Sequence, residues 1–359
     1  MKKLLLILLC LPFFVTTLLA DGYRIEGEVK GLKNSTSVIL AYYFGGKQYA
    51  TDTTKVRNGK FIFRGEKELN GGMYLVVLPS QNYFDIIISE QRFSFSTELD
   101  DLVGSMEFRD SDENPPFYEY LKFITEKQRE VTPIRQQLET ADGERKQELQ
   151  YKASIIDDEV RIYREDFLYK YRYLFFSKII TATTEIEIPE SPLDEDGNPD
   201  EYFAWRYYKK HFWDNMTFSD ERMLRTPIFF AKMVRYLDEL TVQDPDSIMV
   251  SADILVERSK ENDEIFQYVV SYITSTYERS EIIGMDAVFV HMAEKYYLTG
   301  QCNWVDDGQR KKVVDRARKI YNAKPNYEPN KPIQSKNKSN YSSTDSEIII
   351  EMRKSGGIY

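Results

Sequence analysis

The sequence has few of the residues that carry most protein chemistry, with two cysteines and two histidines among 359 residues. Cys10 and Cys302 lie far apart, so there is no C-x-x-C pair. Dithiol exchange needs one thiolate that attacks and a second thiol that resolves the mixed disulfide. His211 and His291 form neither H-x-x-x-H nor H-E-x-x-H, which gives a histidine-based zinc site little support. Because a glycine-rich phosphate loop and a G-x-S-x-G motif are also missing, we assign no catalytic, cofactor-binding or metal-ligating residue.

Basic side chains are outnumbered, with 48 Lys and Arg against 58 Asp and Glu and a formal net charge of −10 at pH 7. A chain of this charge repels phosphate backbones. The sequence also contains no basic stripe interleaved with aromatic residues. The composition therefore speaks against nucleic acid as a partner.

Long apolar runs are absent except near the N-terminus, where Leu4 to Val15 follows two lysines. This basic head, the apolar run and the small residue Ala20 predict a secretory signal peptide over residues 1–20. The run is shorter than the roughly 20 residues that a membrane-spanning helix needs. An uncleaved anchor and a lipid-modified Cys10 are the alternatives. We expect an exported protein of the periplasm or cell envelope that is not transmembrane after signal cleavage.

Short strands are expected over residues 21–112. Residues 23–29 alternate apolar and polar side chains, as does a strand with one face on a core. Asn58-Gly59 separates two β-rich runs and supplies the positive φ angles of a tight hairpin turn. Further runs of this kind follow without helical periodicity between them. The pattern predicts an antiparallel β-sandwich.

Helical periodicity begins after Asn114-Pro115-Pro116. Apolar residues at steps of three, four and seven predict two helices that form an antiparallel hairpin. These helices and five later ones are expected over residues 117–138, 149–174, 226–240, 246–259, 263–277, 282–297 and 308–321. The fold class is therefore α+β. The expected parts are a signal peptide (1–20), a β-sandwich (21–112), a helical domain (113–325) and a low-complexity tail (326–359).

Three residues are candidates for contact with a ligand or a partner, namely Trp205, Trp213 and Cys302. The two tryptophans lie in aromatic stretches that could form a binding platform, although aromatic residues at these spacings more simply fill seams between helices. Cys302 is the only thiol left after removal of the signal peptide. It is either a small, half-buried apolar residue or one half of an intermolecular disulfide.

The order of these parts resembles the N-terminal portion of TlpA-like thiol-disulfide oxidoreductases of Gram-negative anaerobes. In the β domain the resemblance rests on residues 23–29 and 58–65. In the helical domain it rests on residues 208–218, Arg225-Thr226-Pro227 and residues 284–300, which are similar to the uncharacterised helical domain of a subset of this family. These stretches carry no catalytic signature.

The resemblance implies that a thioredoxin-like domain with C-x-x-C follows the helical domain. Residues 326–359 occupy that place and contain no cysteine, so we expect no enzyme activity from this chain on its own. Our first hypothesis is a non-catalytic envelope protein that binds or positions a partner, such as a thioredoxin-like or other envelope protein. A truncated or split oxidoreductase, with C-x-x-C in another reading frame or chain, is the second. A carbohydrate or peptide binder is the third.

Overall fold

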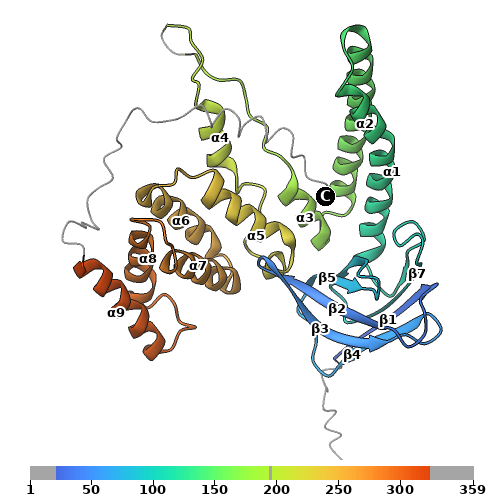
Figure 1. The fold of residues 1–359 in the computed structure, drawn as a ribbon, viewed down its shortest axis with the longest axis horizontal. Coiled ribbons are helices and arrows are strands. Elements are labelled where there is room, and N and C mark those ends of the chain that lie inside the picture. Colours follow the sequence, from blue (N-terminus) through green and yellow to red (C-terminus); the bar gives the residue numbers. More distant parts are fainter. Residues whose placement is uncertain (1–21, 194–195, 324–359) are drawn as a thin grey trace, which may run out of the picture.

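The computed structural model describes residues 22–193 and 196–323. The predicted signal peptide and the predicted tail lie outside these residues. Figure 1 shows a β domain joined to a helical region, with a long two-helix hairpin that projects from the β domain. The predicted α+β class and the order of its two parts are confirmed.

Two four-stranded sheets form the β domain, in the orders β4-β1-β7-β8 and β3-β2-β5-β6. Phe84 on β6 and Phe95 on β7 contact each other between the sheets, with ring centroids 5.5 Å apart. The predicted sandwich is therefore confirmed. The strands are β1 (Tyr23–Lys30), β2 (Ser37–Phe44), β3 (Lys47–Lys55), β4 (Lys60–Gly65), β5 (Gly72–Val77), β6 (Tyr83–Ile88), β7 (Arg92–Glu98) and β8 (Glu107–Arg109).

One strand pair differs from the antiparallel prediction, because β1 and β7 run parallel. Parallel neighbours need a long crossover connection, and here the connection from β1 to β7 contains the whole second sheet. The predicted turn is confirmed, since Asn58 and Gly59 have φ angles of 52° and 76°.

The helical region contains α-helices, one 3₁₀ turn (η1) and two π-helical turns (η2 and η3). The elements are α1 (Asn114–Leu138), α2 (Gly143–Lys170), α3 (Phe175–Thr183), α4 (Phe203–His211), η1 (Glu221–Arg225), α5 (Pro227–Val234), η2 (Arg235–Glu239), α6 (Pro245–Ser259), α7 (Asp263–Glu278), α8 (Asp286–Met292), η3 (Ala293–Leu298) and α9 (Asp307–Ala323). Within residues 22–193 and 196–323, no helix combines the length and hydropathy that a bilayer crossing requires.

Helices α1 and α2 form the predicted hairpin (Figure 1). Val131 of α1 packs with Ala153 and Ile156 of α2 in a small cluster separate from the main core. Nearer the β domain, the rings of Phe123 and Tyr163 stack with centroids 3.8 Å apart. The second helix ends at Lys170, and a separate short helix, α3, follows it.

Candidate functional site at the domain junction

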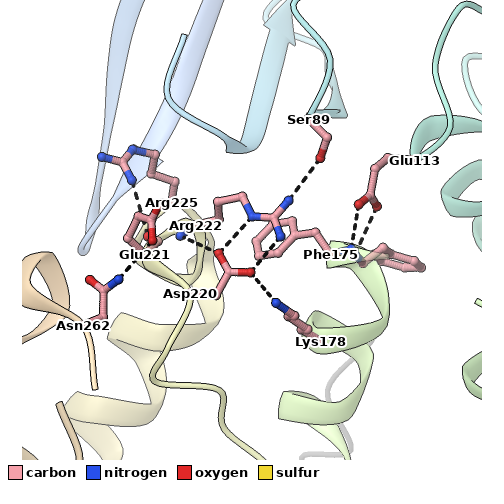
Figure 2. A network of polar contacts seen from close by, with 10 residues as sticks. Ser89, Glu113, Phe175, Lys178, Asp220, Glu221, Arg222, Arg225 and Asn262 are labelled. Atoms are coloured by element: carbon pink, nitrogen blue, oxygen red, sulfur yellow. Dashed lines mark hydrogen bonds and ion pairs between the residues drawn. The ribbon is translucent and has the colours of Figure 1, made fainter. Parts of the chain in front are cut away.

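A buried carboxylate, Asp220, lies at the centre of the polar network between the two domains (Figure 2). Arg222 donates to both carboxylate oxygens, from Nε to Oδ1 at 2.9 Å and from Nη2 to Oδ2 at 2.7 Å. Lys178 of α3 donates from Nζ to Oδ2 at 2.6 Å. Asp220 also precedes η1 and accepts the backbone N–H of Arg222, as a capping residue does. One carboxylate therefore fixes η1 against α3.

Arg222 connects this network to the β domain. Its Nη1 lies 3.3 Å from the hydroxyl oxygen of Ser89, which follows β6 (Figure 2). Its guanidinium carbon lies 4.4 Å from the ring centroid of Phe175. A planar guanidinium can donate in its plane and stack on an aromatic face at the same time. A lysine in place of Arg222 would lose both the in-plane hydrogen bonds and the stacking on the ring of Phe175.

Glu113 and Asn114, at the start of α1, provide a second set of contacts. The Glu113 carboxylate accepts the backbone N–H groups of Phe175 and Phe176 at 2.6 and 3.3 Å, so it lies at the N-terminus of α3. Burial raises the pKa of Glu113. The Asn114 side chain exchanges two hydrogen bonds, each of 2.8 Å, with the backbone of Ile87 on the edge strand β6. Both residues tie helices to the rim of the sandwich.

Arg225 makes the third contact. Its Nη2 lies 2.5 Å from Oε1 of Glu264 on α7, and its guanidinium carbon lies 5.6 Å from the ring centroid of Phe44 on β2. Gly72 at the start of β5 has a φ angle of +143°, and a Cβ atom there would lie 2.4 Å from Cβ of Arg225. The absence of a side chain at Gly72 therefore allows η1 to approach the sheet.

Apolar packing extends these contacts at the turn between β2 and β3. Phe44 meets Tyr268 of α7 edge to face, with centroids 5.4 Å apart. A Cβ atom at Gly46 would lie 2.3 Å from Cε1 of Phe230 on α5. The backbone N–H of Gly45 donates to the carbonyl oxygen of Leu224. The β domain thus contacts η1, α5 and α7 directly.

The junction has the properties of a structural connection. The junction residues are Ser89, Glu113, Lys178, Asp220, Arg222 and Arg225. Burial alone would raise the pKa of Asp220, but the hydrogen bonds from Arg222 and Lys178 outweigh it and lower the pKa to about 2. A carboxylate with this pKa stays ionised near neutral pH and is a poor proton donor. The network is therefore suited to holding the domains together.

The two candidate tryptophans lie in different environments. Trp213 is 1% exposed, and its ring packs against Phe212, Phe218 and Tyr236. Trp205 on α4 is half-buried, with the centroid of its ring 5.5 Å from Nζ of Lys209. Trp205 therefore offers a ligand more access than Trp213, which lies in the core.

Lys209 lies between aromatic rings on α4 and η2. Its Nζ is 5.7 Å from the ring centroid of Tyr236, in addition to its contact with Trp205. Burial lowers the pKa of Lys209 to about 8. The aromatic stretch identified in the sequence thus forms a seam between helices.

Cys302 is fully buried in the segment that precedes α9. It is the only free cysteine in the described part of the chain. Burial raises the pKa of its thiol to about 12. Because the thiolate is the reactive form, this environment disfavours both nucleophilic attack and intermolecular disulfide formation.

Each histidine pairs with a carboxylate. His291 Nε2 lies 2.9 Å from Oδ1 of Asp253, which also accepts the hydroxyl of Tyr296, and His211 Nδ1 lies 2.6 Å from Oδ2 of Asp214. Over residues 22–193 and 196–323, no group of three or more His, Cys, Asp or Glu side chains is arranged to hold a metal ion.

Sequence reasoning did not assign the junction. Asp220 comes shortly after one of the stretches that carry the family resemblance, but Lys178 and Ser89 are 42 and 131 positions away in the chain from it. The sequence predicted the helix over 226–240, and in the structure the Thr226 hydroxyl oxygen accepts the N–H of Ile228 at the start of α5. The prediction locates this helix without indicating what it contacts.

Comparisons with known proteins divide the chain in the same way as the fold. Residues 23–117 match the family model described as Domain of unknown function (DUF4369), and residues 176–323 match Domain of unknown function (DUF5106). Ser89 and Glu113 lie in the first match and the other junction residues in the second. Most of the α1–α2 hairpin lies between the two matches. No curated protein and no solved structure matches the chain.

Proposed function

We propose that this chain is a non-catalytic module of the cell envelope whose two domains form one rigid scaffold that binds or positions a partner. The single observation that carries the proposal is the junction, in which side chains from both domains satisfy one another around the buried Asp220. Buried charges that are paired and hydrogen-bonded resist separation, because breaking one pair leaves an uncompensated charge. A scaffold needs such a fixed geometry.

The environment of the thiol supports the non-catalytic part of this proposal. Cys302 is buried and its thiol pKa is about 12. Even a second thiol supplied by another protein would find no exposed thiolate with which to exchange. The chemistry of a thiol-disulfide oxidoreductase would therefore have to come from a separate domain or chain.

The proposed partner and location rest on the sequence. The predicted signal peptide over residues 1–20 favours the periplasm or cell envelope as the location. The resemblance to TlpA-like proteins favours a thioredoxin-like or other envelope protein as partner. A truncated or split oxidoreductase remains the alternative, because the same scaffold would serve a C-x-x-C domain encoded elsewhere. Trp205 beside Lys209 keeps a carbohydrate or peptide ligand as a further candidate.

An insulin disulfide-reduction assay with dithiothreitol as electron donor tests the non-catalytic assignment. We expect no activity above background from the purified protein or from its Cys302→Ser variant. Activity in both would overturn the proposal and require chemistry at other groups. Activity in the unsubstituted protein alone would assign the reaction to Cys302 and would also overturn it. N-terminal sequencing of the secreted form tests export, for which cleavage after Ala20 is the expected result.

A further inference from the structure

Helix α2 carries a row of exposed apolar side chains on the face opposite its packed face. The row, named the α2 stripe, starts at Tyr151 and continues at steps of four, seven and seven residues, which places its members on one side of a helix. It consists of Tyr151, Ile155, Ile162 and Tyr169, with exposures of 69%, 41%, 51% and 79%.

The α2 stripe is not the face that holds the hairpin together. Leu149, Ala153, Ile156 and Phe167 of α2 are buried, and Ala153 and Ile156 pack with Val131 of α1. Single exposed apolar residues are ordinary on protein surfaces. Four in one row along a helix that already has a packed apolar face indicate a second packing surface. In Figure 1 the far end of the hairpin lies away from the sandwich.

The charges beside the stripe are mainly negative. Glu148, Asp158, Glu165 and Asp166 are exposed and stand three or four positions from a stripe residue, which makes them its neighbours on the helix surface. Arg161 pairs with Asp158 and Glu165, and Lys152 pairs with Glu148. Asp166 has no ion pair within the described residues. Arg145 also pairs with Glu148. Three of the four carboxylates are thus paired, and the stripe has an acidic rim in that acidic side chains outnumber basic ones beside it.

We propose that the α2 stripe docks an amphipathic helix of another protein, with an apolar seam flanked by lysine and arginine. This deepens the proposed function, on which it rests, by naming the class of partner that the scaffold binds. The heptad-like steps fit the seam of a second helix. From Tyr151 to Tyr169 the stripe extends about 27 Å along the axis, which corresponds to a partner helix of about five turns.

Charge selects this occupant over a second copy of the chain. Two α2 stripes face to face would place their acidic rims together, in a protein that already carries a net charge of −10. Like charges across an interface suppress pairing, whereas opposite charges speed association and fix register. A basic rim on the partner would also pair with Asp166.

Synthetic peptides test the proposal with the full chain. The probe is a fluorescein-labelled peptide of about 25 residues with Leu at its seam positions and Lys beside them, and a second peptide has Glu in place of each Lys. We expect the Lys peptide to bind, with an affinity that falls with added salt, and the Glu peptide not to bind. The double variant Ile155→Ser/Ile162→Ser should weaken binding by at least about tenfold. Ile283→Ser, which changes a 99% exposed isoleucine outside α2, should leave it unchanged.

Three results of the peptide assay would overturn the inference. These are equal binding of the Lys peptide to the double variant, equal binding of both peptides to the unsubstituted protein, and no binding of the Lys peptide. Sedimentation that shows a dimer abolished by the double variant would also overturn it, in favour of a second copy. Circular dichroism of the double variant checks that α2 still folds. Failure of peptide binding without insulin reduction refutes this docking face alone, whereas insulin reduction refutes the non-catalytic function.

Discussion

Asp220 and Arg222 are joined by two charge-assisted hydrogen bonds that use both oxygens of the carboxylate. The pair lies within one turn of chain, yet its effect reaches across the molecule, because Arg222 also contacts Ser89 of the β domain. A local pairing thus orients a side chain that joins two domains. Planar, bidentate pairs of this kind add geometric specificity as well as energy.

Asp220→Asn should destabilise the protein by about 2–3 kcal/mol, because it leaves Arg222 and Lys178 without their shared counter-charge. The loss is smaller than for a fully buried pair, since both cations retain some contact with water. Urea unfolding followed by tryptophan fluorescence measures it, and all three tryptophans lie in the helical region. Asp100→Asn, at an exposed aspartate, is the control. Equal stability of the two variants would contradict the assigned role of Asp220.

Asp85→Asn should raise stability near neutral pH. Burial raises the pKa of Asp85 to about 6, although the hydrogen bond from Tyr43 opposes this effect. The folded state therefore binds a proton between about pH 4 and pH 6 that the unfolded state does not, and the protein loses stability as the pH rises through this window. The rise of the Asp85 pKa to about 6 corresponds to a loss of about 3 kcal/mol in the free energy of unfolding once the pH is above this window.

Urea unfolding at a series of pH values checks this prediction. The contribution of Asp85 should be absent from the variant, so its stability curve should be flatter than that of the unsubstituted protein between pH 4 and pH 6. The variant should exceed the unsubstituted protein most in free energy of unfolding above pH 6. A variant with the same slope as the parent, or with lower stability at pH 7, would contradict the raised pKa.

The fold was largely predictable from local patterns, and the exceptions have physical reasons. A helix was predicted over 226–240, and α5 with η2 extends from Pro227 to Glu239. The hairpin turn at Asn58-Gly59 was predictable because it depends on the φ angles of two neighbouring residues, and the structure confirms that both angles are positive. The parallel pairing of β1 with β7 was missed, because it depends on where a distant strand inserts.

The candidate site was much less predictable than the fold. Cys302 was interpreted first as a small, half-buried apolar residue, whereas the structure buries it fully. Trp205 and Trp213 lie in neighbouring aromatic stretches, yet Trp213 is in the core and Trp205 is half-buried, because helix packing decides exposure. The contact of Asp220 with Lys178 joins positions 42 apart. No periodicity in the sequence encodes such a pair.

The Cys302 thiol should be almost unreactive in the folded protein. Burial raises its pKa to about 12, so the thiolate fraction at pH 8 is on the order of 10⁻⁴. Ellman's reagent should therefore titrate about one thiol rapidly in urea and almost none in buffer over the same time, for protein without its signal peptide. Rapid reaction in buffer would show an accessible thiol and would contradict the burial.

The rigidity of the scaffold is tested most directly by a distance between its two domains. Because the native thiol is buried, spin labels can be attached selectively at Thr51→Cys on β3 and Lys311→Cys on α9, both exposed positions. Pulsed electron paramagnetic resonance then gives the distribution of distances between the labels. One narrow distribution is predicted. A broad distribution, or several separate distances, would show that the domains move independently and would contradict the account.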